Sequence, residues 1–329
     1  GGIYSRSAKS IEINEQMKMA FDISADRLTP AELIHALLKA PVELIWNGGI
    51  GTYVKGSDET HGEVGEKTND PVRVNGNELR CKVFGEGGNL GLTQLGRVEF
   101  GLNGGACNTD FIDNAAGVDC SDHEVNIKIL LDELVANGDL TGKQRNKLLA
   151  NMTESVSDLV LQNNYRQTFA ISIAEYETNK RSNELRRFIN FLEESGRLDR
   201  GLEFLPTDET LAERQGVGKS LTRPELSVLI SYAKVMLKDE LISSDIAEDA
   251  YVVKEIETAF PPTLRERYSN EIYSHRLRRE IVGTQVANDL VNNLGIAAGH
   301  RLLETTGASL SEIAKAYIVS RDDFQFNRF

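Results

Sequence analysis

The spacing of apolar residues changes near residue 120, and this change constrains the fold more than any other feature of the sequence. Before it, short apolar runs end in glycine-rich turns, which is typical of buried strands. Residues 42–46 and 81–84 are the predicted strands, and residues 110–112 are a third candidate. After residue 120 the apolar residues recur at helical spacing. The sequence therefore predicts an α/β part followed by an all-α part.

Four capping boxes, in which Ser or Thr is followed three residues later by Glu, predict helix starts. They begin at Thr29, Ser121, Thr222 and Ser309. The helix after Ser121 should carry one apolar stripe and end near Gly138; the stripe consists of Ile127, Leu130, Leu131 and Leu134. Residues 55–80 are polar and read as a long loop.

The charge balance and the cysteine content argue against several classes of function. The chain has 37 basic and 50 acidic residues, a net charge of −13, which disfavours nucleic acids and anionic membranes as partners. No apolar run is long enough for a membrane span, and there is no signal peptide. Three cysteines without a CxxC pair indicate a reducing, cytoplasmic setting. Cys120 and His123 have no second ligand at metal-binding spacing, so we predict no metal site.

Two glycine turns resemble phosphate-binding loops. Residues 47–51 have two glycines of GxGxxG, but no helix is predicted to follow, so this turn lacks the helix N-terminus that binds pyrophosphate. Residues 85–91 read GxGxxxG after a predicted strand, and Asp110 lies at the spacing of an acid that binds ribose. Two interpretations stay open from the residues alone: a dinucleotide site over residues 81–113, or a tight strand-to-helix turn.

Three segments resemble the large NAD-specific glutamate dehydrogenases of bacteria: WNGGIGTYVK, KVFGEGGNLGLTQLGRVEF and NTDFIDNAAGVDCSDHEVNIKILLDEL. The resemblance is close from residue 42 to residue 134, and the helical half is compatible with that family's C-terminal region. Chains of the family are several times longer, and this one starts without methionine, so we expect a C-terminal fragment. The resemblance implies the end of a Rossmann-like NAD-binding domain over residues 1–136 and a helical domain over residues 137–329.

The resemblance also implies site residues. Asn89 and Asn114, in the turns Glu-Gly-Gly-Asn and Asn-Ala-Ala-Gly-Val, would contact the nicotinamide half of NAD, with Gly48 and Gly49 near its ribose. Ser121 would bind the side-chain carboxylate of L-glutamate. On the residues alone, the asparagines could serve turn geometry and Ser121 could simply cap its helix.

The activity that the resemblance implies is NAD-dependent oxidation of L-glutamate to 2-oxoglutarate and ammonia. The family's catalytic lysines and pyrophosphate loop lie upstream, so we assign no catalytic residue here and expect this chain to be inactive alone. We expect the full-length protein to be a homo-oligomer, and the partial domain to expose apolar sheet surface that self-associates. The alternative is a non-catalytic helical module for assembly or regulation.

Overall fold

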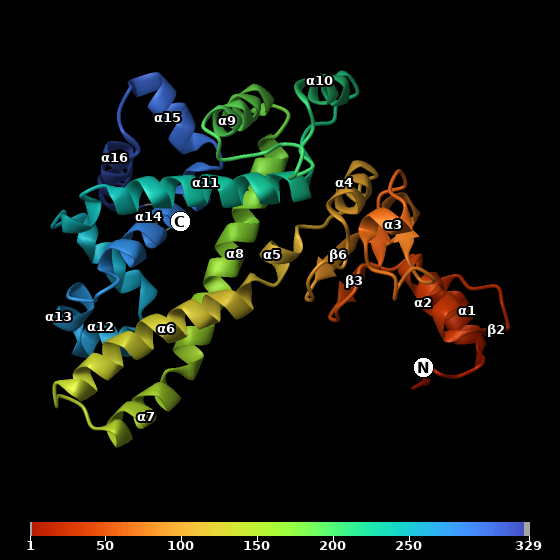
Figure 1. Cartoon of the computed structure of the whole chain (residues 1–329), viewed down its shortest axis with the longest axis horizontal. Helices are drawn as coiled ribbons and strands as arrows, with labels where there is room; N and C mark the ends of the chain where they lie inside the picture. Colours follow the sequence, from red (N-terminus) through yellow and green to blue (C-terminus); the bar gives the residue numbers. More distant parts are fainter. Residues whose placement is uncertain (1, 326–329) are drawn as a thin grey trace. The chain divides into compact units, whose positions relative to one another are not determined.

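The computed structural model describes residues 2–325 and divides into two compact units (Figure 1). The first unit comprises the chain up to Asn114 together with Arg200–Val228. The second comprises Ala115–Asp199 together with the chain from Leu229 onward. The predicted order, an α/β part followed by a helical part, is confirmed.

The first unit mixes short strands and helices. Its strands are β1 (Ile11–Glu12), β2 (Arg27–Leu28), β3 (Leu44–Asn47), β4 (Val54–Lys55), β5 (Val74–Asn75) and β6 (Val83–Glu86). Its helices are α1 (Glu15–Phe21), α2 (Pro30–Leu38), α3 (His61–Val64), η1 (Gly76–Glu78), α4 (Gln94–Leu102), α5 (Asp110–Asp113), α10 (Asp208–Gly216) and the start of α11 (Arg223–Ser243).

The strands pair two by two. β3 and β6 are parallel, with Leu44 opposite Val83 and Asn47 opposite Glu86, which confirms the two main strand predictions. β4 and β5 are also parallel, whereas β1 and β2 are antiparallel. The main core of the unit lies against β3 and β6 and is built from buried residues of several elements: Leu38, Val54, Val74, Leu79, Cys81, Phe84, Leu92, Phe100 and Cys107.

The third strand candidate, residues 110–112, is wrong. These residues form the helical turn α5, and β6 is instead bridged on its second side by Ala106. Aspartate is unfavourable in strands, and in α5 the carboxylates of Asp110 and Asp113 accept hydrogen bonds from the backbone N–H groups of Leu90 and Glu86. These bonds hold the segment as a turn.

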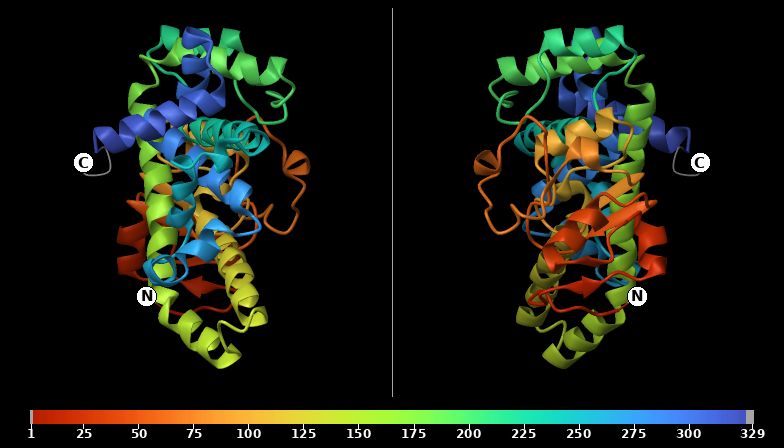
Figure 2. Two further views of the ribbon diagram at one scale, coloured as in Figure 1. Left: turned by 90° about the vertical axis from the view of Figure 1, so that its left-hand side faces the viewer. Right: turned by 90° about the vertical axis from the view of Figure 1, so that its right-hand side faces the viewer.

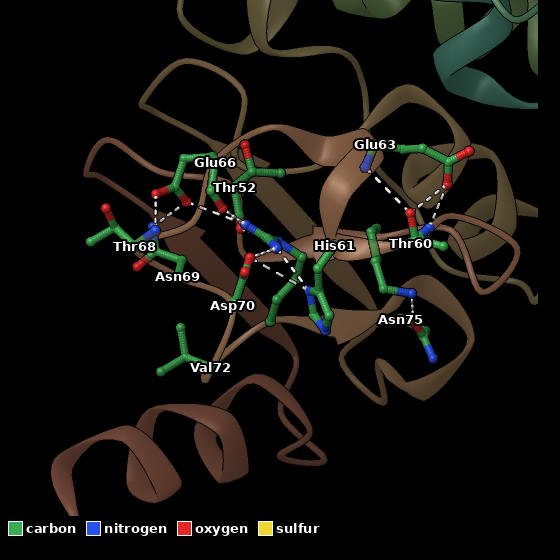
Figure 3. A network of polar contacts seen from close by, with 12 residues as sticks. Thr52, Thr60, His61, Glu63, Glu66, Thr68, Asn69, Asp70, Val72 and Asn75 are labelled. Atoms are coloured by element: carbon green, nitrogen blue, oxygen red, sulfur yellow. Dashed lines mark hydrogen bonds and ion pairs between the residues drawn. The ribbon is translucent and has the colours of Figure 1, made fainter.

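The predicted loop over residues 55–80 is organised around one buried side chain, Arg73. Its partners Thr52, His61, Glu66 and Asp70 are labelled in Figure 3. Its Nε donates to the Thr52 carbonyl at 2.8 Å, and its guanidinium forms ion pairs with Glu66 and Asp70. The ring of His61 lies 2.9 Å from the same guanidinium. These contacts tie residues 52, 61, 66 and 70 to one side chain, and the segment contains the elements α3, β5 and η1.

The second unit is helical. Its elements are α6 (Ala115–Ala136), α7 (Gly142–Asn151), α8 (Thr153–Glu177), α9 (Ser182–Glu194), the rest of α11, η2 (Ile246–Glu248), η3 (Val252–Ala259), α12 (Pro262–Arg267), α13 (Ser269–Tyr273), α14 (Arg278–Leu294), α15 (Ala298–Thr306) and α16 (Leu310–Asp323). Helix α6 packs on α7 and α8, and α14 packs on α8, η3 and α16. Across residues 2–325, none of the helices has the length and apolar content that a membrane crossing needs.

Three of the four predicted helix starts are confirmed. Thr29 and Ser309 form complete capping boxes. At Thr222, the residue before α11, the backbone N–H and the hydroxyl donate to the Glu225 carboxylate. The box at Ser121 is wrong, because α6 already begins at Ala115 and Ser121 lies within it. The Ser121 hydroxyl donates to the Gly117 carbonyl at 3.2 Å, one turn back, which is a common arrangement for serine inside a helix.

The apolar stripe predicted for this helix is confirmed. Ile127, Leu130, Leu131 and Leu134 are buried. The helix ends at Ala136, and Gly138 follows in the left-handed region with φ of +85°, where glycine is favoured.

The three cysteines differ in reactivity. Cys81 and Cys107 are buried, whereas Cys120 is exposed on α6. Desolvation raises the pKa of Cys81 to about 11 and raises that of Cys107 well above its ordinary value, so few of these thiols ionise at neutral pH. We expect one thiol of the folded chain to react rapidly with Ellman's reagent and all three to react in denaturant. Two rapid thiols in the folded protein would contradict this burial.

Candidate functional site

The carboxyl ends of β3 and β6 lie side by side and define the candidate site. Asn47 and Glu86, the last residues of the two strands, are register partners. The turns that follow are joined by a hydrogen bond from the Gly88 N–H to the Asn47 carbonyl at 3.0 Å. In parallel α/β sheets, ligands bind outside the carboxyl ends of the strands, so this edge is where a ligand is expected.

Glycines let the two turns approach each other and leave the strand end open. A Cβ atom on Gly88 would lie 2.4 Å from the Gly49 carbonyl oxygen, and one on Gly91 would lie 2.2 Å from Nδ2 of Asn47. A Cβ on Gly49 would meet nothing within 4 Å, and one on Gly48 would make ordinary contact with Trp46. Gly88 and Gly91 are therefore needed for packing, while Gly48 and Gly49 keep the edge uncovered.

Asn89 and Asn114 meet at this edge although 25 residues separate them. Asn114 Nδ2 donates to Asn89 Oδ1 at 2.9 Å. Asn89 is exposed and Asn114 is half-buried at the end of α5. Nearby, the Nδ2 group of Asn47 is buried and has no hydrogen-bond partner among the described residues. The edge thus presents amide groups that can both donate and accept.

A buried ion pair supports the turn after β6. The Glu86 side chain is fully buried and that of Arg97 is 4% exposed; Arg97 Nε lies 2.6 Å from Glu86 Oε1. Glu86 also accepts from the Leu92 N–H, and Arg97 contacts Asp110 at 3.1 Å. Desolvation raises the pKa of Glu86 despite the opposing effect of Arg97. Sequence patterns missed this pair, because two isolated charges eleven residues apart form no motif.

Asp110, which has the spacing of an acid that binds ribose, has another role in the structure. One carboxylate oxygen accepts from the Leu90 N–H at 2.9 Å and the other faces Arg97. Asp113 likewise accepts from the Glu86 N–H, and its burial raises the pKa of this carboxyl group. Helix α4 then starts at Gln94, capped by Thr93. These contacts favour the strand-to-helix interpretation of residues 85–91.

The remaining predicted site residue, Ser121, belongs to the second unit, where its side chain is exposed on α6. His123, two residues further, is buried, and its Nδ1 lies 2.9 Å from the Ala259 carbonyl oxygen. In the part of the chain that the structure describes, no group of three or more His, Cys, Asp or Glu residues could hold a metal ion.

Two family models match this chain. Residues 1–174 match the catalytic domain of bacterial NAD-glutamate dehydrogenase, and residues 218–329 match the C-terminal region of glutamate dehydrogenase. Since the first match covers more than half of the 329 residues, the chain belongs to the bacterial NAD-glutamate dehydrogenase family.

Individual relatives agree with this assignment. The chain is 62% identical over 324 residues to an NAD-specific glutamate dehydrogenase of Pseudomonas aeruginosa, and 58% identical over 328 residues to one of Halomonas elongata. It is 43% identical over 326 residues to one of Mycobacterium tuberculosis. These alignments cover 97–100% of this chain and 20% of each relative. The chain therefore spans about one fifth of the length of the relatives it matches.

Proposed function

We propose that this chain supplies the nicotinamide side of the cofactor site in an NAD-dependent glutamate dehydrogenase. The whole protein would convert L-glutamate, NAD and water into 2-oxoglutarate, ammonia and NADH. The observation that carries the proposal is the pairing of Asn89 with Asn114 beside the carboxyl ends of β3 and β6. The match to the catalytic domain of bacterial NAD-glutamate dehydrogenase supports this class of reaction, the NAD-dependent oxidation of glutamate.

The residues at this edge suit a nicotinamide riboside. Asn89 and Asn114 would hold its carboxamide and ribose hydroxyls, because an amide offers donors and an acceptor together. Gly48 and Gly49 would leave room for the ribose, and the buried, unpartnered Nδ2 of Asn47 is a further donor. The chemistry that NAD supplies when bound is acceptance of a hydride from the substrate's α-carbon.

Other parts of the reaction are assigned to the rest of a longer protein. The basic groups that bind both substrate carboxylates, the lysine that moves protons and the loop that binds pyrophosphate would lie outside this chain. Within it, Ser121 is proposed to contact the side-chain carboxylate of glutamate through its exposed hydroxyl. We further propose that the chain is inactive alone, that it acts in a cytoplasmic enzyme, and that residues 137–329 serve as a helical domain.

The test uses a chimera in which this chain replaces the matching segment of the Pseudomonas aeruginosa relative. Asn89→Ala and Asn114→Ala should each raise the KM for NAD about fivefold, because each removes one hydrogen bond worth about 1 kcal/mol. The matched control is Asn103→Ala, which changes an exposed asparagine at the end of α4.

Two results would overturn the proposal. The first is that the unmutated chimera is active but Asn89→Ala and Asn114→Ala change its KM for NAD no more than the control does. The second is tight binding of NAD by this chain alone in titration calorimetry. Such binding would show that the chain holds a complete dinucleotide site, whereas the proposal divides the site between this chain and the rest of a longer protein. Weak or no binding by the isolated chain, together with a higher KM in the variants, supports the proposal.

A further inference from the structure

Helix α8 of the second unit carries an exposed apolar stripe along most of its length. Its members are Leu161, Tyr165, Phe169, Ile173 and Tyr176, whose exposed fractions run from 45% for Ile173 to 80% for Tyr176. At 3.6 residues per turn they fall within about 120° of one another around the helix. Figure 2 shows α8 in yellow-green as one straight, unbroken helix. An apolar patch of this extent marks an interaction surface.

Charges of opposite sign continue the stripe at its two ends. Asp158 lies on the same face before Leu161. Lys180 follows the end of α8, and its Nζ lies 5.9 Å from the centre of the Tyr176 ring, the last member of the stripe. Both charged side chains are exposed. The face is therefore acidic at its N-terminal end, apolar in the middle and basic at its C-terminal end.

The pattern is nearly symmetric about Phe169, since Leu161 and Tyr176 lie eight and seven residues from it. Asp158 and Lys180 are each eleven residues from it, and Tyr165 and Ile173 are each four residues from it. A second α8 laid antiparallel across Phe169 would place Asp158 of each copy opposite Lys180 of the other. The same residues of both copies would then form the contact, as a two-fold interface requires.

Space for a side chain from the other copy lies beside the stripe. A hollow of 320 Å³ is lined by Phe169 and Ile173 of α8, by Arg181 and Leu185, and by the end of α14. In the antiparallel register, Tyr165 of the other copy lies opposite Ile173, at the border of this hollow. An aromatic side chain entering a pocket is the usual centre of a stable interface.

From these observations we infer that α8 is a self-association surface whose occupant is a second copy of this chain, antiparallel about Phe169. The inference does not depend on the proposed cofactor site, since all its residues lie in the second unit. Charge complementarity selects this occupant: each end of the stripe attracts the opposite end of an identical stripe, and no other charged residue lies within the stripe.

Sedimentation velocity on the 329-residue chain tests the inference through charge reversal. The wild type should dimerise, and Asp158→Lys or Lys180→Asp alone should raise the dimer dissociation constant roughly tenfold, because two attractive contacts become repulsive. An equimolar mixture of the two single variants should regain wild-type affinity, since both end contacts are then attractive again. A monomeric wild type, or a mixture that stays as weak as its components, would overturn the antiparallel pairing.

Cross-linking tests the register. In a Cys120→Ser background, Phe169→Cys should be joined between two copies by a short bismaleimide, because the axis passes through this position. Ser157→Cys, exposed near the N-terminal end of α8, is the control, since its two copies would lie about 36 Å apart along the helices. Equal cross-linking of both variants, or of neither, would overturn the register and would point to another segment of a longer protein as the occupant.

Discussion

Replacing Arg97 with methionine should destabilise the first unit by about 3–5 kcal/mol, which is the usual cost of removing one partner from a buried ion pair. The Glu86 carboxylate has no exposed surface, and after the substitution it keeps the Leu92 N–H as a hydrogen-bond donor but no cation. The neighbouring carboxylate of Asp110 would also lose its contact with Arg97. The carboxyl groups of Glu86 and Asp110 would then lie close together, with no cation between them and little access to water.

This destabilisation should depend on pH in a defined direction. Burial already raises the pKa of Glu86 above its ordinary value, and the loss of Arg97 removes the effect that opposes this rise. The folded Arg97→Met variant then holds a proton that the unfolded chain releases, so its stability should fall as pH rises above the ordinary glutamate range. We expect a larger difference from wild type at pH 7 than at pH 5.

Urea denaturation followed by the fluorescence of Trp46 measures the effect, because this is the chain's single tryptophan and it lies on β3 beside β6. Glu86→Gln combined with Arg97→Met should recover much of the loss, since the buried charge is gone and the Leu92 N–H keeps an acceptor. Arg80→Met is the matched control: its ion pair with Asp22 is exposed and should be worth at most about 1 kcal/mol. A loss in Arg97→Met no larger than in this control would contradict the burial argument.

Helices are best predicted from the sequence where they carry an amphipathic stripe, or where a capping box follows a non-helical segment. The stripe ending at Leu134 and the start of α11 just after Thr222 were predictable for this reason. Ser121 differs from these two cases. A capping box is a local pattern, and it marks no helix start here because the chain is already helical from Ala115 onward.

Short segments in the first unit were harder to predict. Residues 110–112 contain two apolar residues, which suit a strand or a helical turn equally, and the choice follows from carboxylate contacts with residues 86 and 90. The position of Asn89 against Asn114 required a family resemblance, because spacing alone cannot bring two turns together. The predicted domain boundary between residues 136 and 137 stays a prediction, whereas the compact units divide between Asn114 and Ala115 and again on either side of Arg200–Val228.

The self-association expected from an incomplete domain can now be assigned to a surface, the exposed face of β3 and β6. β3 exposes Leu44 and Trp46, and β6 exposes Val83, so the first unit has an uncovered apolar sheet face. Within residues 2–325 no segment covers this face, and no arrangement of charges around it indicates which surface would bind there. The stripe on α8 differs because its terminal charges specify an occupant.

Lys234 should make the second unit more stable as pH rises from 7 to 9, by about 2 kcal/mol. This lysine lies on α11, where its Nζ donates to Gln167 Oε1 at 2.7 Å. It borders a cavity of 130 Å³ lined mainly by amide side chains of Asn163, Asn164, Gln167, Asn288 and Asn292. Desolvation lowers the pKa of Lys234 to about 7, although Asp119 acts in the opposite direction.

The sign follows from proton binding. Between pH 7 and the ordinary lysine pKa of 10.5, the unfolded chain holds a proton on Lys234 that the folded chain has released. Stability therefore rises with pH over this window, by at most about 1.4 kcal/mol per pH unit. Below pH 7 both states are protonated and this contribution no longer changes with pH.

The measurement is urea denaturation at several pH values, followed by far-ultraviolet circular dichroism, which reports chiefly on the helical unit. Lys234→Met should abolish the rise between pH 7 and 9, whereas Lys143→Met, which removes an exposed lysine from α7 of the same unit, should keep it. Because other groups titrate in both proteins, the decisive quantity is the difference between the two variants. Equal slopes would mean that Lys234 stays charged when folded, with the cavity polar enough to solvate an ammonium group.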